Sequence, residues 1–374
     1  MIRGAVFPSR YIQGAGAIKE LARHLQPLGN KALVVLDPGI AEMMMPFLND
    51  ACRDKIALVI HRFPGESTEA AMREAAAVAD RENCPIIIGV GGGKAIDTAK
   101  GAAYFHPARL IVIPTICASD APCSKNAVVY RPDGTVERDI HGLFNPDIVL
   151  VDSAIIAKAP TRYLSAGIAD ALATWFEAES SWMTRHTNFT GYAPSRTAYA
   201  IARLCYDTLL ENAPLAVRHA GLGLVTPQLE DTIEACTLMS TVGFESGGLA
   251  AAHGFHQGLA QLPECHRFLH GEKVAVGIVA SLFLTQRPAA LIEQIYRFHL
   301  ATRLPVCLRD INVTDKSPEH LGVAIERITD PGEVTAWEPI RYGAEECLNA
   351  LLAADAYGEA MKAAVGAAAG DASR

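Results

Sequence analysis

The first 160 residues alternate between short apolar runs and amphipathic stretches. Continuous apolar runs of four to seven residues are typical of strands buried on both faces of a parallel sheet. Stretches with helical spacing separate them, as in repeated strand–helix–strand units. The pattern therefore predicts a doubly wound parallel sheet. The predicted strands are 32–36, 56–62, 86–90, 110–114 and 148–151, and the clearest helices between them are 67–81 and 94–100.

Two smaller features complete this first half. Residues 1–14 mix apolar and turn-forming residues, and we expect them to add an edge strand or a hairpin. In residues 127–138, two strand-like runs flank Pro132-Asp133-Gly134. A proline–aspartate–glycine turn between such runs predicts an antiparallel hairpin inserted into the sheet region.

Beyond Pro160 the strand signals almost vanish, and helical patterns take over. These cover 164–179, 195–212, 229–241, 272–285 and 344–364. We therefore predict two domains: a Rossmann-like α/β domain over 1–160 and an all-helical domain over 161–374. The active site is expected in the cleft between them.

Composition and charge narrow the class of protein. The chain has 374 residues, half of them hydrophobic, and a formal net charge of −8. This charge argues against nucleic acid or an anionic membrane as the main partner. No apolar run approaches the ~20 residues that cross a bilayer, and the N-terminus does not read as a signal peptide. Nine cysteines without a C-x-x-C pair indicate reduced thiols, so we expect a cytoplasmic enzyme.

The segment PIIIGVGGGKAIDTAK, residues 85–100, carries the first candidate site. Its three consecutive glycines lie between a buried strand and a helix, where backbone N–H groups and the helix dipole favour phosphate. The segment matches neither G-x-G-x-x-G nor the P-loop pattern. Glycine-rich turns also end ordinary strands, so phosphate binding is one of two interpretations.

Two further features suit a dinucleotide. Asp37 follows the first strand, where a carboxylate can accept hydrogen bonds from the adenosine ribose and repel a 2′-phosphate, favouring NAD over NADP. The loop 114–130 follows another buried strand and offers Thr115, Ser119 and Ser124 to the cofactor and Asp120 to a substrate hydroxyl. A turn-forming aspartate and ordinary side-chain capping are the alternatives.

Asp170, His253 and His270 are candidate metal ligands. Each lies in a stretch rich in small or apolar residues, where an unpaired polar side chain is costly to bury. Two histidines and one carboxylate form a usual ligand set for catalytic zinc. His256 and His266 lie close by in the sequence and could be ligands instead. A lone buried histidine is also more often a hydrogen-bonded core residue than a ligand.

Taken together, these segments resemble the glycerol dehydrogenases, the zinc-dependent branch of the iron-containing alcohol dehydrogenase superfamily. The resemblance covers roughly residues 2–362 and implies the fold of that superfamily, which is shared with dehydroquinate synthase. Its most specific segments are GVGGGKAIDTAK, PTICASDAPCS, NPDIVLVDSAIIAKAP, AGIADALATWFEA, GFESGGLAAAHGFHQGL and HRFLHGEKVAVG.

The resemblance implies that domain 1–160 binds NAD and domain 161–374 binds the metal. It also implies a role for each candidate residue. Asp170, His253 and His270 would hold the metal, Asp120 would bind the substrate hydroxyls, and Asp37 would bind the adenosine ribose. The pyrophosphate would be held by Gly92, Gly93, Lys94 and Asp97. The nicotinamide side of the cofactor would be lined by Thr115, Ser119, Ser124 and Tyr130.

The implied reaction is NAD-dependent, zinc-assisted oxidation of glycerol to dihydroxyacetone, or of related vicinal diols, by hydride transfer. The iron-dependent branch has a fourth ligand, a histidine, one turn after the aspartate, and Thr174 stands there in this chain. Zinc is therefore favoured over iron. The family tends to form large homo-oligomers, so an octamer is expected by resemblance.

Two departures from the family pattern bear on the substrate. Cys117-Ala118-Ser119-Asp120 replaces the more common Ala-Ser-Thr-Asp, and Lys125-Asn126 replaces a small apolar pair. An ammonium at Lys125 would suit the carboxylate of a 2-hydroxy or 2-oxo acid. The alternative function is therefore a dehydrogenase or reductase of the same superfamily that acts on such an acid or on another small alcohol.

Two other classes of protein fit these residues less well. A lyase like 3-dehydroquinate synthase would need a site rich in Lys and Arg, and few lie near the metal segments. A non-enzymatic metal-binding protein would leave the glycine turn and the Asp120 loop without a purpose.

Overall fold

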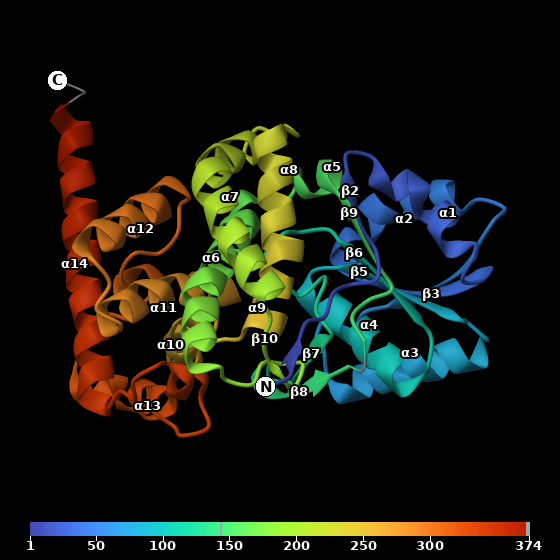
Figure 1. The fold of residues 1–374 in the computed structure, drawn as a ribbon. Coiled ribbons are helices and arrows are strands. Elements are labelled where there is room, and N and C mark those ends of the chain that lie inside the picture. Colours follow the sequence, from blue (N-terminus) through green and yellow to red (C-terminus); the bar gives the residue numbers. More distant parts are fainter. Residues whose placement is uncertain (143, 372–374) are drawn as a thin grey trace.

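The computed structural model describes residues 1–142 and 144–371. A parallel sheet with flanking helices forms one half and helices alone form the other, as the right and left sides of Figure 1 show. This arrangement confirms the predicted fold class, an α/β N-terminal region followed by a helical C-terminal region.

The sheet has six strands, and every pair of neighbours is parallel. The five predicted apolar runs all form strands of this sheet. The sixth, β2, pairs with β9 at one edge and is the edge strand expected from residues 1–14. In spatial order the strands are β2 (Tyr11–Gly14), β9 (Ile148–Asp152), β6 (Arg109–Pro114), β5 (Ile86–Gly91), β3 (Lys31–Leu36) and β4 (Ala57–Arg62).

Apolar side chains on both faces explain why the central strands are continuously hydrophobic. On β3, Val34 joins a core cluster with Met44 and Leu48 of α2 (Ala41–Cys52). Its neighbour Val35 points to the opposite cluster, with helices α3 (Glu69–Arg81) and α4 (Gly93–Phe105). The short α1 (Leu21–Leu25) lies with α2 in Figure 1. Burying each Val or Leu fully stabilises the fold by ~1.5–3 kcal/mol.

The predicted hairpin is present as β7 (Asn126–Tyr130) and β8 (Val136–His141). The two strands are antiparallel, with a register irregularity between Val129 and Tyr130. Ala127, Val129 and Ile140 pack on Met72 of α3, so the hairpin covers the outer side of the α3–α4 layer.

The helical half begins at Thr161. Its longer helices correspond to the predicted ones, but the structure divides 229–241 into α8, a π-helical turn at Ala235–Met239 and α9. Three further helices, α10, α12 and α13, were not predicted. The helices are α6 (Thr161–Thr184), α7 (Arg196–Ala220), α8 (Pro227–Glu234), α9 (Ser240–Gly247), α10 (Ala251–Leu259), α11 (His270–Leu284), α12 (Ala289–Ala301), α13 (Pro318–Ile328) and α14 (Ala344–Asp371), and the short α5 (Ser153–Ile156) precedes them.

The N-terminal segment joins the two halves. Strand β1 (Arg3–Gly4) pairs in parallel with β10 (Ala193–Pro194), which lies between α6 and α7. The backbone N–H of Val6 donates to Ser246 Oγ at 2.9 Å. The chain then enters the sheet as β2, so it starts against the helical half and crosses to the sheet half.

None of the helices in the described part of the chain combines the length and the apolar character that a membrane span requires.

Candidate active site

The strand order identifies the edge of the sheet where a ligand can bind. From β3 the chain moves outward to β4 and then returns to β5 on the other side of β3, before continuing to β6 and β9. Ligands of open α/β sheets bind at such a reversal, beyond the carboxyl ends of the strands. Asp37 follows β3 and the glycine turn follows β5, so both predicted cofactor segments lie at this point.

The backbone of the glycine turn explains its residue types. Gly91 has φ +152°, and a Cβ added there would lie 2.9 Å from Ala95 Cβ and 3.0 Å from Asp37 Cβ. Gly92 begins α4 without a side-chain hydrogen bond to the helix N-terminus. The first N–H groups of α4 are therefore available to an anion, as phosphate binding requires.

Lys94 and Tyr130 lie together beside this turn. Lys94 Nζ is 2.7 Å from the Glu66 carboxylate and 4.6 Å from the centre of the Tyr130 ring. Asp97 is buried one turn further along α4 and accepts a hydrogen bond from Val128 N at 3.2 Å. Burial raises the pKa of Asp97 to about 6. Its carboxylate is thus bonded to the hairpin.

Lys100, which the sequence analysis did not single out, holds the loop 114–130. Its buried ammonium donates to the carbonyls of Ala121 at 2.6 Å and Asn126 at 2.7 Å and to Ser124 Oγ at 3.0 Å. Asp97 lies 3.4 Å from the same ammonium. Ser124 is therefore bonded within the loop, and one buried cation holds the segment from Ala121 to Asn126.

Two other predicted residues of this loop lie nearer its start. Thr115 is buried, and its N–H donates to the carbonyl of Gly91, so it adjoins the glycine turn. Ser119 Oγ accepts a long hydrogen bond from Ala121 N at 3.4 Å. Both follow β6, the strand beside β5, at the carboxyl edge of the sheet.

Asp120 connects this loop to the helical half. Its Oδ2 accepts from Ser240 Oγ at 2.8 Å, and its carbonyl accepts from Thr241 Oγ1 at 2.7 Å. Its N–H donates to Asp170 Oδ2 at 3.2 Å. Burial, and then the negative charge of Asp170, raises the pKa of Asp120 well above its ordinary value. The predicted substrate-binding carboxylate therefore adjoins the predicted metal site.

The three predicted metal ligands converge from three helices. Asp170 comes from α6, His253 from α10, and His270 is the first residue of α11. Asp170 Oδ1 lies 3.0 Å from His270 Nε2 and 3.4 Å from His253 Nε2, and the three ligand atoms lie within 4.8 Å of one another. One oxygen and two imidazole nitrogens in this arrangement fit a three-ligand zinc site with an open position.

The electrostatics of the cluster favour an ionised Asp170. Burial alone would raise the pKa of this carboxyl, but the imidazoles of His270 and His253 outweigh it and lower the pKa below its ordinary value. His256 is buried with its ring 4.2 Å from that of His270, and His266 is exposed. Neither belongs to this group of convergent ligand atoms.

Two buried glutamates that the sequence analysis missed support the site. Glu177 Oε2 lies 2.7 Å from His253 Nδ1. Glu245 accepts from the backbone N–H of Lys125 at 2.9 Å and from Asn145 Nδ2 at 2.5 Å, which ties the loop to α9. The contacts of Glu177 join residues 73 or 76 apart and those of Glu245 join residues 100 or more apart, so no local pattern marks them.

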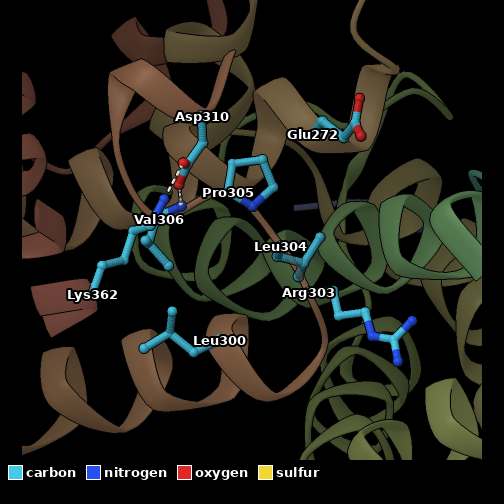
Figure 2. Close-up of a pocket in the computed structure, with 8 residues that line it drawn as sticks. All are labelled: Glu272, Leu300, Arg303, Leu304, Pro305, Val306, Asp310 and Lys362. Atoms are coloured by element: carbon cyan, nitrogen blue, oxygen red, sulfur yellow. Dashed lines mark hydrogen bonds and ion pairs between the residues drawn. The ribbon is translucent and has the colours of Figure 1, made fainter. Parts of the chain in front are cut away.

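Two other features resemble sites but contain none of the predicted residues. Cys307, Asp355 and Glu359 form a second convergent cluster, but cations already pair with both carboxylates. The Lys316 ammonium lies 2.5 Å from Asp355 and 3.1 Å from Glu359, and the Arg309 guanidinium lies 3.5 Å from Glu359. Figure 2 shows a pocket in the helical half, where Asp310 pairs with Lys362. The pocket is lined by Glu272, Leu300, Arg303, Leu304, Pro305, Val306, Asp310 and Lys362.

Comparison with known proteins gives consistent results over the whole chain. Residues 8–153 match the family described as iron-containing alcohol dehydrogenase. A glycerol dehydrogenase of Thermotoga maritima is 44% identical over 362 residues, covering 97% of this chain and 99% of the relative.

Solved structures agree with this result. A probable glycerol dehydrogenase from Sinorhizobium meliloti superposes with a TM-score of 0.90 at 40% identity, covering 96% of this chain and 99% of that one. The glycerol dehydrogenase of Schizosaccharomyces pombe gives 0.92 at 31% identity, with coverage of 98% and 93%.

Proposed function

We propose that this chain, which belongs to the iron-containing alcohol dehydrogenase family, oxidises glycerol to dihydroxyacetone with NAD and a bound zinc ion. The observation that carries the proposal is the convergence of Asp170, His253 and His270 beside the loop of Asp120. The full-length similarity to glycerol dehydrogenases supports the choice of glycerol, with other vicinal diols as further substrates.

The roles of the residues follow from their positions. When bound, NAD takes the hydride from the substrate carbon, and zinc lowers the pKa of the reacting hydroxyl, whose proton is released. Asp170, His253 and His270 hold the metal. Asp120 receives the Ser240 bond on Oδ2, and we assign its Oδ1 to a hydroxyl of glycerol. This contact orients the carbon for hydride transfer.

The cofactor is assigned to the reversal point of the sheet. The N–H groups at the start of α4, with Gly92, Gly93 and Lys94, would hold the pyrophosphate. Asp37 takes the adenosine ribose, and its charge disfavours a 2′-phosphate. We assign Asp97 to an indirect role, because its carboxylate bonds Val128 N. Thr115, Ser119, Ser124 and Tyr130 line the nicotinamide side.

The surroundings of Thr174 support zinc over iron. Its hydroxyl is buried 3.1 Å from Ser240 Oγ, and Ser240 in turn donates to Asp120. A Cβ added at Gly243 would lie 2.2 Å from Thr174 Cγ2, so the position is tightly packed. There is little room for a fourth, histidine ligand, and three protein ligands are usual for catalytic zinc.

The acid-specific alternative fits this site less well. Lys125 brings one cation near the loop, but the buried side chain of Glu245, which accepts from the backbone N–H of Lys125 at 2.9 Å, places a carboxyl group beside it. Asp120 and Asp170 place two further carboxyl groups in the same region. Carboxyl groups can form hydrogen bonds with the hydroxyls of a polyol, but they do not pair with the carboxylate of a hydroxy acid.

The test is the reduction of NAD and NADP by the zinc-loaded protein with glycerol, 1,2-propanediol and 2-hydroxybutyrate. We expect fast NAD reduction with glycerol, slower reduction with the propanediol and little with NADP. Activity with the hydroxy acid alone would replace glycerol by the acid and make Lys125 the residue that selects the substrate. Absence of reduction with every substrate would refute a dehydrogenase.

We also propose that the protein forms a homo-oligomer, as the resemblance implies. Exposed apolar side chains on α7 and in the loop after it, Leu204, Leu215 and Leu222, support association. Light scattering on the purified protein measures the number of subunits, and a monomer would contradict the proposal.

A further inference from the structure

Glu177 is a buried carboxylate on the helix that supplies Asp170. The two residues are seven positions apart on α6, so they lie on the same face of the helix. Glu177 is 1% exposed, and its nearest ring nitrogen is Nδ1 of His253, 2.7 Å from Oε2. One helix face therefore holds a proposed metal ligand and also contacts a second proposed ligand from behind.

The other oxygen of Glu177 is bonded to the backbone that carries His253. Oε1 accepts from Ala250 N at 3.0 Å and from His253 N at 2.8 Å. These N–H groups lie at the start of α10, where no side chain at Ala250 satisfies them. Both oxygens of Glu177 are thus used, one for the backbone of α10 and one for the imidazole ring.

Glu338 gives a natural comparison at the same helix end. It is also buried, and its carboxylate accepts from Ala251 N at 3.0 Å and from Ser180 Oγ at 2.6 Å. Two carboxylates therefore share the N-terminus of α10, where the helix dipole favours negative charge. Glu338 bonds this backbone and Ser180, whereas Glu177 also bonds the imidazole of His253.

We infer that Glu177 is a positioning residue for the metal: it holds the proton of His253 on Nδ1 and so keeps the Nε2 lone pair directed at the metal beside Asp170. A neutral imidazole has one N–H and one acceptor nitrogen, and a carboxylate only accepts. The hydrogen bond to Glu177 therefore fixes the tautomer and the plane of the ring. This inference rests on the proposed function, and partners of this kind typically change metal affinity by ~10–100-fold.

The variant Glu177→Gln separates the two uses of the carboxylate. Glutamine offers one acceptor oxygen, and the two backbone N–H groups can retain it. Its amide N–H then faces Nδ1, which favours the tautomer with the proton on Nε2. We expect the zinc affinity, measured by competition with a chromophoric chelator, to fall ~10–100-fold, and NAD binding to stay unchanged.

The matched control is Glu338→Gln. It makes the same chemical change at the same helix N-terminus, so it matches any loss of stability from weaker capping. We expect its zinc affinity to stay within about twofold of the parent, since the carboxylate of Glu338 bonds Ala251 N and Ser180 Oγ and neither residue is a proposed metal ligand. If both variants lose zinc affinity equally, Glu177 only caps helix α10 and the inference is wrong. Unchanged zinc affinity in Glu177→Gln would also overturn the inference.

A second measurement needs no variant. In the zinc-loaded parent protein, the ¹⁵N chemical shifts of the His253 ring report which nitrogen is protonated. A protonated Nδ1 and a metal-bound Nε2 are expected, and the reverse pattern would overturn the inference.

The failure of this inference is distinguishable from failure of the proposed function. A parent protein that binds one zinc with the expected tautomer but does not oxidise glycerol keeps the role of Glu177 and refutes the substrate. A parent that binds no zinc refutes both.

Discussion

His299, near the end of α12, allows a quantitative test of how burial controls stability. Its side chain has no exposed area, Nδ1 lies 3.2 Å from the carbonyl oxygen of Pro305, and Nε2 has no hydrogen-bond partner among the described residues. Desolvation penalises the imidazolium and lowers the pKa of His299 to about 4, although the bond to Pro305 opposes this effect. In the unfolded chain the pKa is near the ordinary 6.5.

The sign follows from proton binding. Between pH 6.5 and pH 4 the unfolded chain binds a proton at His299 that the folded protein does not bind. The free energy of unfolding therefore falls as the pH falls through this range, and the group contributes nothing to pH dependence above it. At 1.36 kcal/mol per pH unit, the loss reaches ~3.4 kcal/mol below pH 4, and ~2 kcal/mol of it is present at pH 5.

The variant His299→Asn tests this value, because asparagine keeps an N–H for Pro305 but does not titrate. Urea unfolding of both proteins at pH 7.5 and pH 5.0 gives two differences in unfolding free energy. The parent should lose ~2 kcal/mol more than the variant between these values. Any cavity cost of the smaller side chain is present at both pH values and cancels. Equal losses in the two proteins would refute the reasoning.

Four other substitutions test the proposed site. Asp170→Asn should abolish zinc binding and glycerol oxidation while NAD binding, followed by fluorescence, survives; full activity after dialysis against a chelator would contradict the ligand assignment. Asp37→Ser should raise NADP-dependent turnover relative to NAD-dependent turnover, since the repulsive charge is lost; an unchanged ratio would remove Asp37 from the ribose site. Gly271→Ala should cost ~1–3 kcal/mol of stability, because the new Cβ would lie 1.9 Å from the carbonyl oxygen of Ala166. It should also weaken zinc binding, because Gly271 follows His270 in the chain. Calorimetry measures the first effect and chelator competition the second. Lys100→Met should lower the free energy of unfolding by ~3–5 kcal/mol, because it leaves buried acceptors unpaired. It should also raise the KM for glycerol, because the loop of Asp120 is held less firmly. An unchanged melting temperature would contradict the structural role of Lys100.

The parallel sheet was predictable because a strand that is buried on both faces shows a recognisable pattern in its own sequence. Each central strand is a continuous apolar run, and the hairpin has a proline–aspartate–glycine turn at its tip. Helix α10 shows no such pattern. Its two glycines and two histidines are poor helix formers and outweigh its two alanines. Its N-terminus is satisfied by Glu177 and Glu338, which are distant in the sequence.

The same distinction holds for the site. The cluster of Asp170, His253 and His270 was suggested by polar residues in apolar surroundings, which is a local signal that the fold brings together. The alternatives His256 and His266 could be set apart from them only by three-dimensional arrangement. Lys100 did carry a local signal, because it lies three residues after Asp97 on a face of small residues. The loop that it holds became evident only from the structure.

The short strand β1 has a consequence for how the two halves can move. Because β1 is paired with β10 on the helical side, the polypeptide passes between the halves once before β2 and again after β9. Two covalent crossings at different places restrict rotation of one half relative to the other more than a single crossing would. Hydrogen bonds between Tyr11 and Thr237 and between Gln13 and Glu230 restrict it further. The loop of Asp120 is thereby kept beside Asp170. A protein joined by one linker alone would instead sample many orientations, most of which would separate the loop of Asp120 from the metal ligands.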